Sequence, residues 1–195
     1  MRRLFCATLL FPLLLSAYPF DHPQEPSYVP VEYNAYPPLY FPPSCHWLSA
    51  LSGLGESLEI EDGSVWKVDP YYRREIFYWR INDTLTLTQN RDWFSNMNYR
   101  LVNQTTGGSV AVNLFLGPIL ESEYTRFITA LDTHRGEIIL TDGSHWLVCP
   151  RDFQRFDRWV LNDCILIGSN SGWEPSCDFI LINSNTNDFV RAKQF

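Results

Sequence analysis

The chain has 195 residues, of which 45% are hydrophobic and 15% aromatic, so it can bury real cores and is not a disordered sequence. Its formal net charge is −7, and loss of a leader that carries Arg2 and Arg3 but no acidic residue makes it more negative. Non-specific binding to nucleic acid or to an anionic membrane needs a basic field, so this charge argues against both.

Residues 1–17 have the pattern of a secretory signal peptide. Arg2 and Arg3 precede an apolar stretch, residues 4–15, and small residues follow up to Ala17, after which we expect cleavage. The apolar stretch is short for a membrane span, which needs about 20 residues, and no later stretch is long enough. We therefore expect export to the periplasm, cell surface or extracellular space of a bacterial host, with no transmembrane anchor after leader removal.

Residues 18–45 form a segment rich in proline and tyrosine. Proline fixes φ and removes backbone donors, so this composition predicts an extended, polyproline-like arm. The arm could serve as a stiff spacer or dock into an aromatic groove on the chain itself or on a partner. Docking on a second copy of the chain would produce a homo-oligomer.

Residues 46–195 contain the same sequence pattern twice, at a constant offset of 80 positions. Residues 58–70 read LEIEDGSVWKVDP, and residues 138–150 read IILTDGSHWLVCP. Six of the seven tryptophans fall in matched pairs, which chance does not readily produce. The repeat predicts two modules, residues 46–115 and 126–195.

Each module alternates apolar and polar residues, which is typical of strands and not of helices. Asp62-Gly63 lies between two apolar runs and predicts a hairpin, while residues 84–88 alternate as a half-buried strand. Five short strands per module predict an all-β fold of two tandem SH3-like barrels, with an OB-like barrel as the alternative. For residues 47–51 and 127–131 we expect a short helical turn or an extra edge strand.

The repeated pattern resembles a known type of sequence. Its DGSxWxVxP opening, W-x-x-N-D turn and terminal N-x-x-T hairpin are similar to short repeats in uncharacterised exported bacterial proteins with small β-barrel modules. The resemblance covers both modules but not the arm. It implies the fold and export and carries no activity, because those proteins have no assigned chemistry.

The acidic residues that both modules share fit turns better than catalysis. Asp62 and Asp142 each precede glycine, and aspartate favours such turns because its side chain caps the local backbone. The Asn-Asp pairs at 82–83 and 162–163 have the same interpretation. The calcium-loop pattern is absent, and no catalytic, metal or cofactor motif occurs, so we predict a chain that is not an enzyme and needs no cofactor.

The paired aromatic residues provide the candidate ligand surface. Trp66 and Trp146 lie in alternating strands and are expected in the core. Trp93 and Trp173 follow polar runs and are the first candidates for an exposed surface. The same candidate surface includes two further aromatic residues of the repeat, Tyr99 and Phe179.

Four cysteines remain after the leader, and an even number in an exported chain permits disulfides. The candidates for disulfide bonds are Cys45, Cys149, Cys164 and Cys177. Their spacing matches no zinc signature. A cysteine nucleophile paired with His145 would need Cys149 or Cys164, but no third orienting residue or oxyanion motif accompanies them.

These observations favour an exported, non-enzymatic binding or interaction protein that presents its modules to a protein or a wall polymer. One alternative is an accessory or degenerate relative of a cell-wall hydrolase, since SH3-like modules often accompany such enzymes. The chain has little room for a separate catalytic domain, which argues against it. Another alternative is a structural envelope protein that self-associates through the arm.

Overall fold

The computed structural model describes residues 42–172 and 176–195. These residues belong to one compact unit of the chain, which spans residues 31–195. The predicted signal peptide, residues 18–41 of the predicted arm and Trp173 lie outside the described residues. The described fold is all-β, as the alternation predicts.

Twelve strands and four single-turn helices make up the described fold. The strands are β1 (Cys45–Leu51), β2 (Ser57–Ile60), β3 (Val65–Val68), β4 (Thr84–Gln89), β5 (Tyr99–Asn103), β6 (Ser109–Leu116), β7 (Arg126–Asp132), β8 (Glu137–Leu140), β9 (His145–Val148), β10 (Cys164–Ser169), β11 (Phe179–Asn183) and β12 (Asp188–Gln194). The helices are η1 (Pro70–Tyr72), η2 (Glu75–Tyr78), η3 (Pro150–Asp152) and α1 (Phe153–Phe156).

Strands β1 to β6 form a closed six-stranded barrel, called here the N-terminal barrel. The strands pair in the order β1-β2-β3-β6-β5-β4, and β4 pairs with β1 to close it. The prediction of five strands is therefore wrong for this part of the chain, because residues 45–51 add a sixth strand and do not form a helical turn. In this strand His46 and Leu48 are buried, whereas Cys45, Trp47 and Ser49, which alternate with them, are only partly buried.

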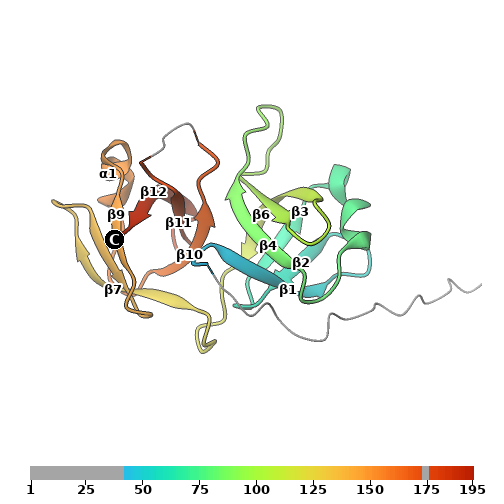
Figure 1. The fold of residues 1–195 in the computed structure, drawn as a ribbon, viewed down its shortest axis with the longest axis horizontal. Coiled ribbons are helices and arrows are strands. Elements are labelled where there is room, and N and C mark those ends of the chain that lie inside the picture. Colours follow the sequence, from blue (N-terminus) through green and yellow to red (C-terminus); the bar gives the residue numbers. More distant parts are fainter. Residues whose placement is uncertain (1–41, 173–175) are drawn as a thin grey trace, which may run out of the picture. The chain divides into compact units, whose positions relative to one another are not determined.

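Strands β7 to β12, called here the C-terminal strands, pair in the order β7-β8-β9-β12-β11-β10, and β10 also pairs with β7. Figure 1 shows β1 to β6 and β7 to β12 as two groups of strands with β10 beside β1. A parallel bridge between Ser169 and Thr88 joins β10 to β4. The described strands thus form one continuous hydrogen-bonded sheet.

Strands β10 and β11 are buried on both faces. Ile165, Ile167 and Leu181 belong to the core of the C-terminal strands. The residues that alternate with them, Leu166 and Ile180, belong with Ile182 to the core of the N-terminal barrel. Eighty positions earlier stand Thr86, Arg100 and Val102, which are only partly buried. The apolar residues at these positions therefore join the two groups of strands.

A buried histidine also crosses between the two groups. The Nε2 atom of His46 in β1 lies 2.8 Å from the Ile167 carbonyl oxygen of β10, and its Nδ1 lies 2.6 Å from a carboxylate oxygen of Glu61. Both partners only accept hydrogen bonds, so both ring nitrogens donate and the ring carries two protons. Burial favours the neutral ring, but the charge and hydrogen bond of Glu61 outweigh it and raise the pKa of His46 to about 9.

Gly168 lies where β10 meets β4 and offers a direct test of this junction. A Cβ atom at Gly168 would lie 2.6 Å from the Leu87 carbonyl oxygen and 2.8 Å from Ile180 Cγ1. Because the carbonyl belongs to the backbone of a central strand, we expect Gly168→Ala to lower the free energy of unfolding by about 1–3 kcal/mol.

Urea unfolding of a chain that begins at residue 18 would measure this loss. Gly53→Ala is the matched control, since a Cβ atom there meets nothing within 4 Å. Equal stability of the two variants would contradict the close approach of β10 to β4.

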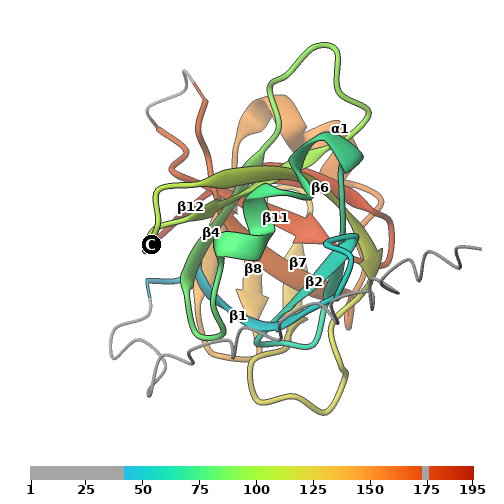
Figure 2. The same ribbon diagram turned by 90° about the vertical axis from the view of Figure 1, so that its right-hand side faces the viewer.

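Two loops project from the same side of the fold. In Figures 1 and 2, the β4–β5 loop, drawn in green, rises above the strands on the side where the β10–β11 loop also leaves them. The β4–β5 loop contains the exposed residues Trp93 and Phe94. The base of this loop borders a cavity.

Candidate ligand-binding groove

The repeated Asp-Gly-Ser-x-Trp segments form tight turns with the same hydrogen bonds. The Ser64 N–H donates to Asp62 Oδ1 over 2.8 Å, and Trp66 Nε1 donates to Ser64 Oγ over 2.9 Å. Gly63 has a φ of 80°, in the left-handed region that glycine adopts without strain. Residues 142–146 repeat these contacts. The predicted turn role of the shared aspartates is confirmed.

The Asn-Asp pairs shape turns as well. Asn82 has a φ of 69°, which asparagine tolerates better than most residues. The buried Asn103 amide donates to Asp83 over 2.6 Å, and the Asn183 amide donates to Asp163 over 2.7 Å. These polar side chains are therefore used by the fold itself.

The paired tryptophans divide into core and surface positions. Trp66 and Trp146 are fully buried, which confirms their predicted place in the core. Trp93 is 93% exposed and its neighbour Phe94 is 95% exposed. The structure therefore places the β4–β5 member of the predicted ligand surface in solvent.

Tyr99 and Phe179 do not lie on an open surface, contrary to their place in the predicted ligand surface. Tyr99 is fully buried, and its ring packs edge-on against Trp66 with 5.6 Å between centroids. Phe179 is partly buried and packs edge-on against Trp146, 5.2 Å away. Side chains alternate between the two faces of a strand, and Tyr99 in β5 and Phe179 in β11 lie on the faces that pack toward the core.

Two of the four candidate cysteines are joined, because Cys149 forms a disulfide with Cys177. Cys45 and Cys164 are free thiols. The disulfide occupies the Cys149 sulfur, and burial raises the pKa of Cys164 to about 11. Neither the disulfide-bonded Cys149 nor the protonated Cys164 therefore provides the thiolate that a cysteine nucleophile needs at neutral pH. His145 is exposed and contacts the Phe195 ring.

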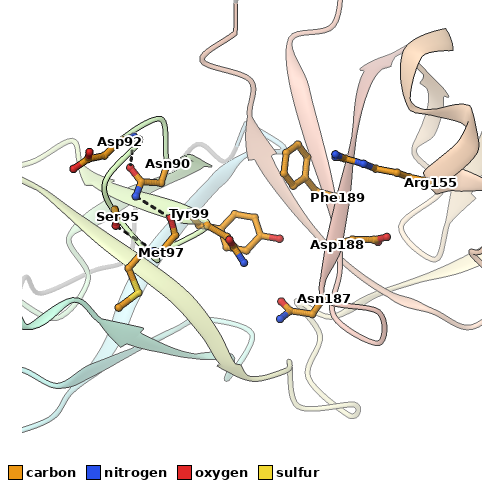
Figure 3. Close-up of a pocket in the computed structure, with 10 residues that line it drawn as sticks. Asn90, Asp92, Ser95, Met97, Tyr99, Arg155, Asn187, Asp188 and Phe189 are labelled. Carbon is orange, nitrogen blue, oxygen red and sulfur yellow. Dashed lines mark hydrogen bonds between the residues drawn. The ribbon is translucent and has the colours of Figure 1, made fainter.

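A cavity of about 490 Å³ lies between the β4–β5 loop and the C-terminal strands, and we call it the groove (Figure 3). Its volume falls in the range of small-molecule sites. It is lined by Asn90, Asp92, Ser95, Met97, Asn98, Tyr99, Arg155, Asn187, Asp188 and Phe189. One wall comes from the N-terminal barrel, and the other comes from α1 and the β11–β12 turn.

The hydroxyl of Tyr99 is the least satisfied polar group of the groove. It is buried and has no hydrogen-bond partner among the described residues. Figure 3 shows it pointing across the groove toward the segment that carries Asp188 and Phe189. Burial, with the nearby charge of Asp188, raises the pKa of Tyr99 above its usual range. Tyr99 is therefore a neutral hydroxyl that can donate one hydrogen bond and accept others.

The opposite wall carries both signs of charge. The Arg155 guanidinium lies 5.5 Å from the centroid of the Phe189 ring, a cation–π contact, and forms no hydrogen bond to the described residues. Asp188 instead accepts hydrogen bonds from Trp159 Nε1, over 3.0 Å, and from Arg158, over 2.8 Å. Asp188 thus contributes a fixed negative charge, whereas Arg155 keeps its donors for another group.

Two asparagines add further free hydrogen-bonding groups. The side-chain amides of Asn98 and Asn187 form no hydrogen bond to the described residues. Asn90, by contrast, uses its amide to hold the loop, since its Nδ2 donates to the Met97 carbonyl over 2.9 Å. The groove therefore combines an ordered loop with side chains that no protein group satisfies.

The lining residues differ from the repeated residues of the fold. Asn90 is the one lining residue whose type recurs 80 positions away. Arg155 stands opposite Glu75 in the alignment, and Asp188 stands opposite Gly108. Sequence reasoning identified Tyr99 but missed Arg155, Asn187, Asp188 and Phe189. The signal available in the sequence was that the residues at these positions differ between the two halves of the chain. A search for shared motifs passes over such positions.

Other features of the described residues give weaker sites. No group of three or more metal-ligating side chains occurs there, and none of the helices is long and apolar enough to cross a membrane. A second cavity of about 330 Å³ is lined in part by Glu56 and Arg73, which pair with each other over 3.1 Å. This ion pair occupies two of the three charged residues that line the second cavity.

Comparison with known proteins finds no matching family model, no matching curated protein and no matching solved structure.

Proposed function

We propose that this chain is an exported, non-enzymatic binding protein that holds a segment of a partner protein or wall polymer in the groove. In this proposal the N-terminal barrel and the C-terminal strands are two copies of one SH3-like barrel. The 80-residue repeat and the shared pairing order of the strands support the duplication. Export is supported by the leader pattern and is compatible with the disulfide between Cys149 and Cys177.

The unpartnered Tyr99 hydroxyl carries the proposal. Leaving a buried hydroxyl without a partner costs about 1–3 kcal/mol, whereas phenylalanine at the same place would avoid that cost. The chain carries phenylalanine at the matched position, Phe179. A hydroxyl retained at a cost to stability, on the floor of a cavity with other free polar groups, is typical of a ligand site.

The net charge of the protein and the free polar groups of the groove restrict the class of partner further. The protein is acidic overall, which argues against nucleic acid. The shared acidic residues are used in turns, so the groove, in which a ligand can meet free donors, is the better candidate for function. Binding without chemistry needs only the complementary polar groups that line the groove.

Replacing Tyr99 with phenylalanine separates binding from folding. We expect Tyr99→Phe to keep or raise the free energy of unfolding, by up to about 1 kcal/mol, because it removes a buried and unsatisfied hydroxyl. We also expect it to weaken binding to solubilised peptidoglycan fragments or to the best member of a peptide library about fivefold. Urea unfolding and isothermal titration calorimetry measure the two effects.

Tyr71→Phe is the matched control, because Tyr71 is 85% exposed and lies outside the groove. It should change neither quantity. If no fragment or peptide binds, or if Tyr99→Phe binds as tightly as the unaltered chain, the groove is not the binding site.

A further inference from the structure

We infer that the groove binds a glycan chain rather than a peptide, an inference that rests on the proposed function. The choice between these classes depends on three properties of the described residues: the state of the strand edges, the polarity of the groove, and the aromatic residues beside it.

The first property is that the strands offer little for peptide addition. A peptide that extends a sheet needs an exposed edge strand. Here β5, which carries Tyr99, pairs with β4 and β6, and β12, which carries Asp188 and Phe189, pairs with β11 and β9, so the two strands that carry groove residues have neighbours on both sides. A peptide would have to bind through its side chains alone.

The second property is the polarity of the groove. Peptide side chains are usually anchored in well-packed apolar or aromatic pockets. The lining is instead dominated by asparagine, aspartate, serine and arginine, and Phe189 is already covered by Arg155 and Tyr99. No apolar pocket for an anchoring side chain is therefore found among the lining residues.

The groove's free groups suit hydroxyl and amide groups instead. The Tyr99 hydroxyl and the amides of Asn98 and Asn187 can each donate and accept, and Arg155 donates. Asp92 supplies a carboxylate from the β4–β5 loop, on the same wall as Tyr99. A sugar unit presents several hydroxyls that both donate and accept, and an amino sugar adds an acetamido group. Such a ligand would satisfy both the hydrogen-bond donors and the hydrogen-bond acceptors of the groove without carrying a large net charge.

The third property is the pair of exposed aromatic residues beside the groove. Trp93 and Phe94 offer flat apolar faces to solvent, against which the C–H face of a sugar can pack. Their loop is ordered by its own hydrogen bonds, from the Phe94 N–H to Asp92 Oδ1 over 3.0 Å and from the Met97 N–H to Ser95 Oγ over 3.1 Å. The backbone that carries the aromatic residues is therefore ordered before a ligand arrives, which lowers the cost of binding.

Calorimetric titration of the full chain without its leader tests the inference with defined probes. The probes are the β-1,4-linked tetramer of N-acetylglucosamine, maltotetraose, and a random peptide library. We expect at least one oligosaccharide to bind with a dissociation constant between roughly 10 μM and 1 mM. Trp93→Ala should weaken that binding about tenfold, and Tyr99→Phe about fivefold.

Leu54→Ala provides the matched control, because Leu54 is 73% exposed and lies outside the groove and its loop. Circular dichroism of each variant checks the fold, which these exposed or conservative changes should leave intact. Oligosaccharide binding that ignores both Trp93→Ala and Tyr99→Phe overturns the glycan inference.

The remaining outcomes separate the inference from the proposed function. If peptides bind in a manner sensitive to Tyr99→Phe and neither oligosaccharide binds, the groove stands as a binding site and the glycan class is wrong. If neither oligosaccharides nor peptides bind, both the inference and the proposed function fall.

Discussion

Replacing His46 with alanine is expected to lower the free energy of unfolding by about 3–5 kcal/mol, because it leaves one member of a buried ion pair without its partner. His46 and Glu61 are both almost completely buried, and the ring also donates to the Ile167 carbonyl of β10. The substitution therefore removes a charge pair and a link between the N-terminal barrel and the C-terminal strands. Urea unfolding at pH 6 and low salt would measure the loss.

The same histidine predicts a dependence of stability on pH. Its pKa is about 9 in the folded chain and about 6.5 when unfolded, so the folded state holds the proton more tightly. The contribution of His46 is thus fully present below pH 6.5 and is lost as pH rises through 9. Glu61 and Asp62 are the charged groups that favour the proton. We expect unfolding midpoints to fall between pH 7 and 9.5 in the unaltered chain, and to fall less in His46→Ala.

A double-mutant cycle separates the pair from its surroundings. His46→Gln with Glu61→Gln removes both charges and keeps side chains that can share a hydrogen bond. We expect the double variant to be less destabilised than the sum of the two single variants. Additive losses, or a midpoint that does not change with pH, would show that His46 and Glu61 do not act as a buried charge pair.

The repeated turns could be predicted from sequence because their causes are local. Asp62 and Ser64 lie two residues apart and bond to each other and to Trp66, so a short motif contains all the chemistry. The six-stranded closure could not be predicted with equal ease. It depends on β1 meeting β4, and residues 47–51 alone do not distinguish a strand from a turn.

The junction and the groove depend on contacts between distant residues. Leu166 and Ile180 are apolar and buried, whereas the residues at the matched positions in the N-terminal barrel are only partly buried. The sequence alone does not show which residues cover Leu166 and Ile180. In the same way, Tyr99 and Phe189 lie 90 positions apart but place their ring centroids 6.1 Å from each other. Polar neighbours favour exposure of Trp93, and the residue is exposed, whereas the residues that form the far wall of the groove come from the other half of the chain.

Removing the disulfide is expected to have the second large effect. Cys149 and Cys177 are 28 positions apart, and opening a loop of this size costs about 3–4 kcal/mol because the unfolded chain regains freedom. The bond ties the base of the β10–β11 loop to the end of β9, a link that Asp69 and Met97 cannot form at the matched positions. We expect Cys149→Ser with Cys177→Ser to lower the urea midpoint and to speed amide exchange in residues 170–172 and 176–178.

The β4–β5 loop is the internal reference for that experiment, because no disulfide holds it. Its amide exchange should stay unchanged in the double variant, and Cys45→Ser should leave both loops unaltered, since Cys45 is a partly exposed free thiol. Alkylation of the protein purified without reductant should label Cys45, and Cys164 after unfolding, but neither Cys149 nor Cys177. Labelling of all four would show that the purified chain lacks the bond. Because the disulfide anchors the β10–β11 loop alone, its loss should leave oligosaccharide binding at Tyr99 and Trp93 within about twofold of the unaltered chain.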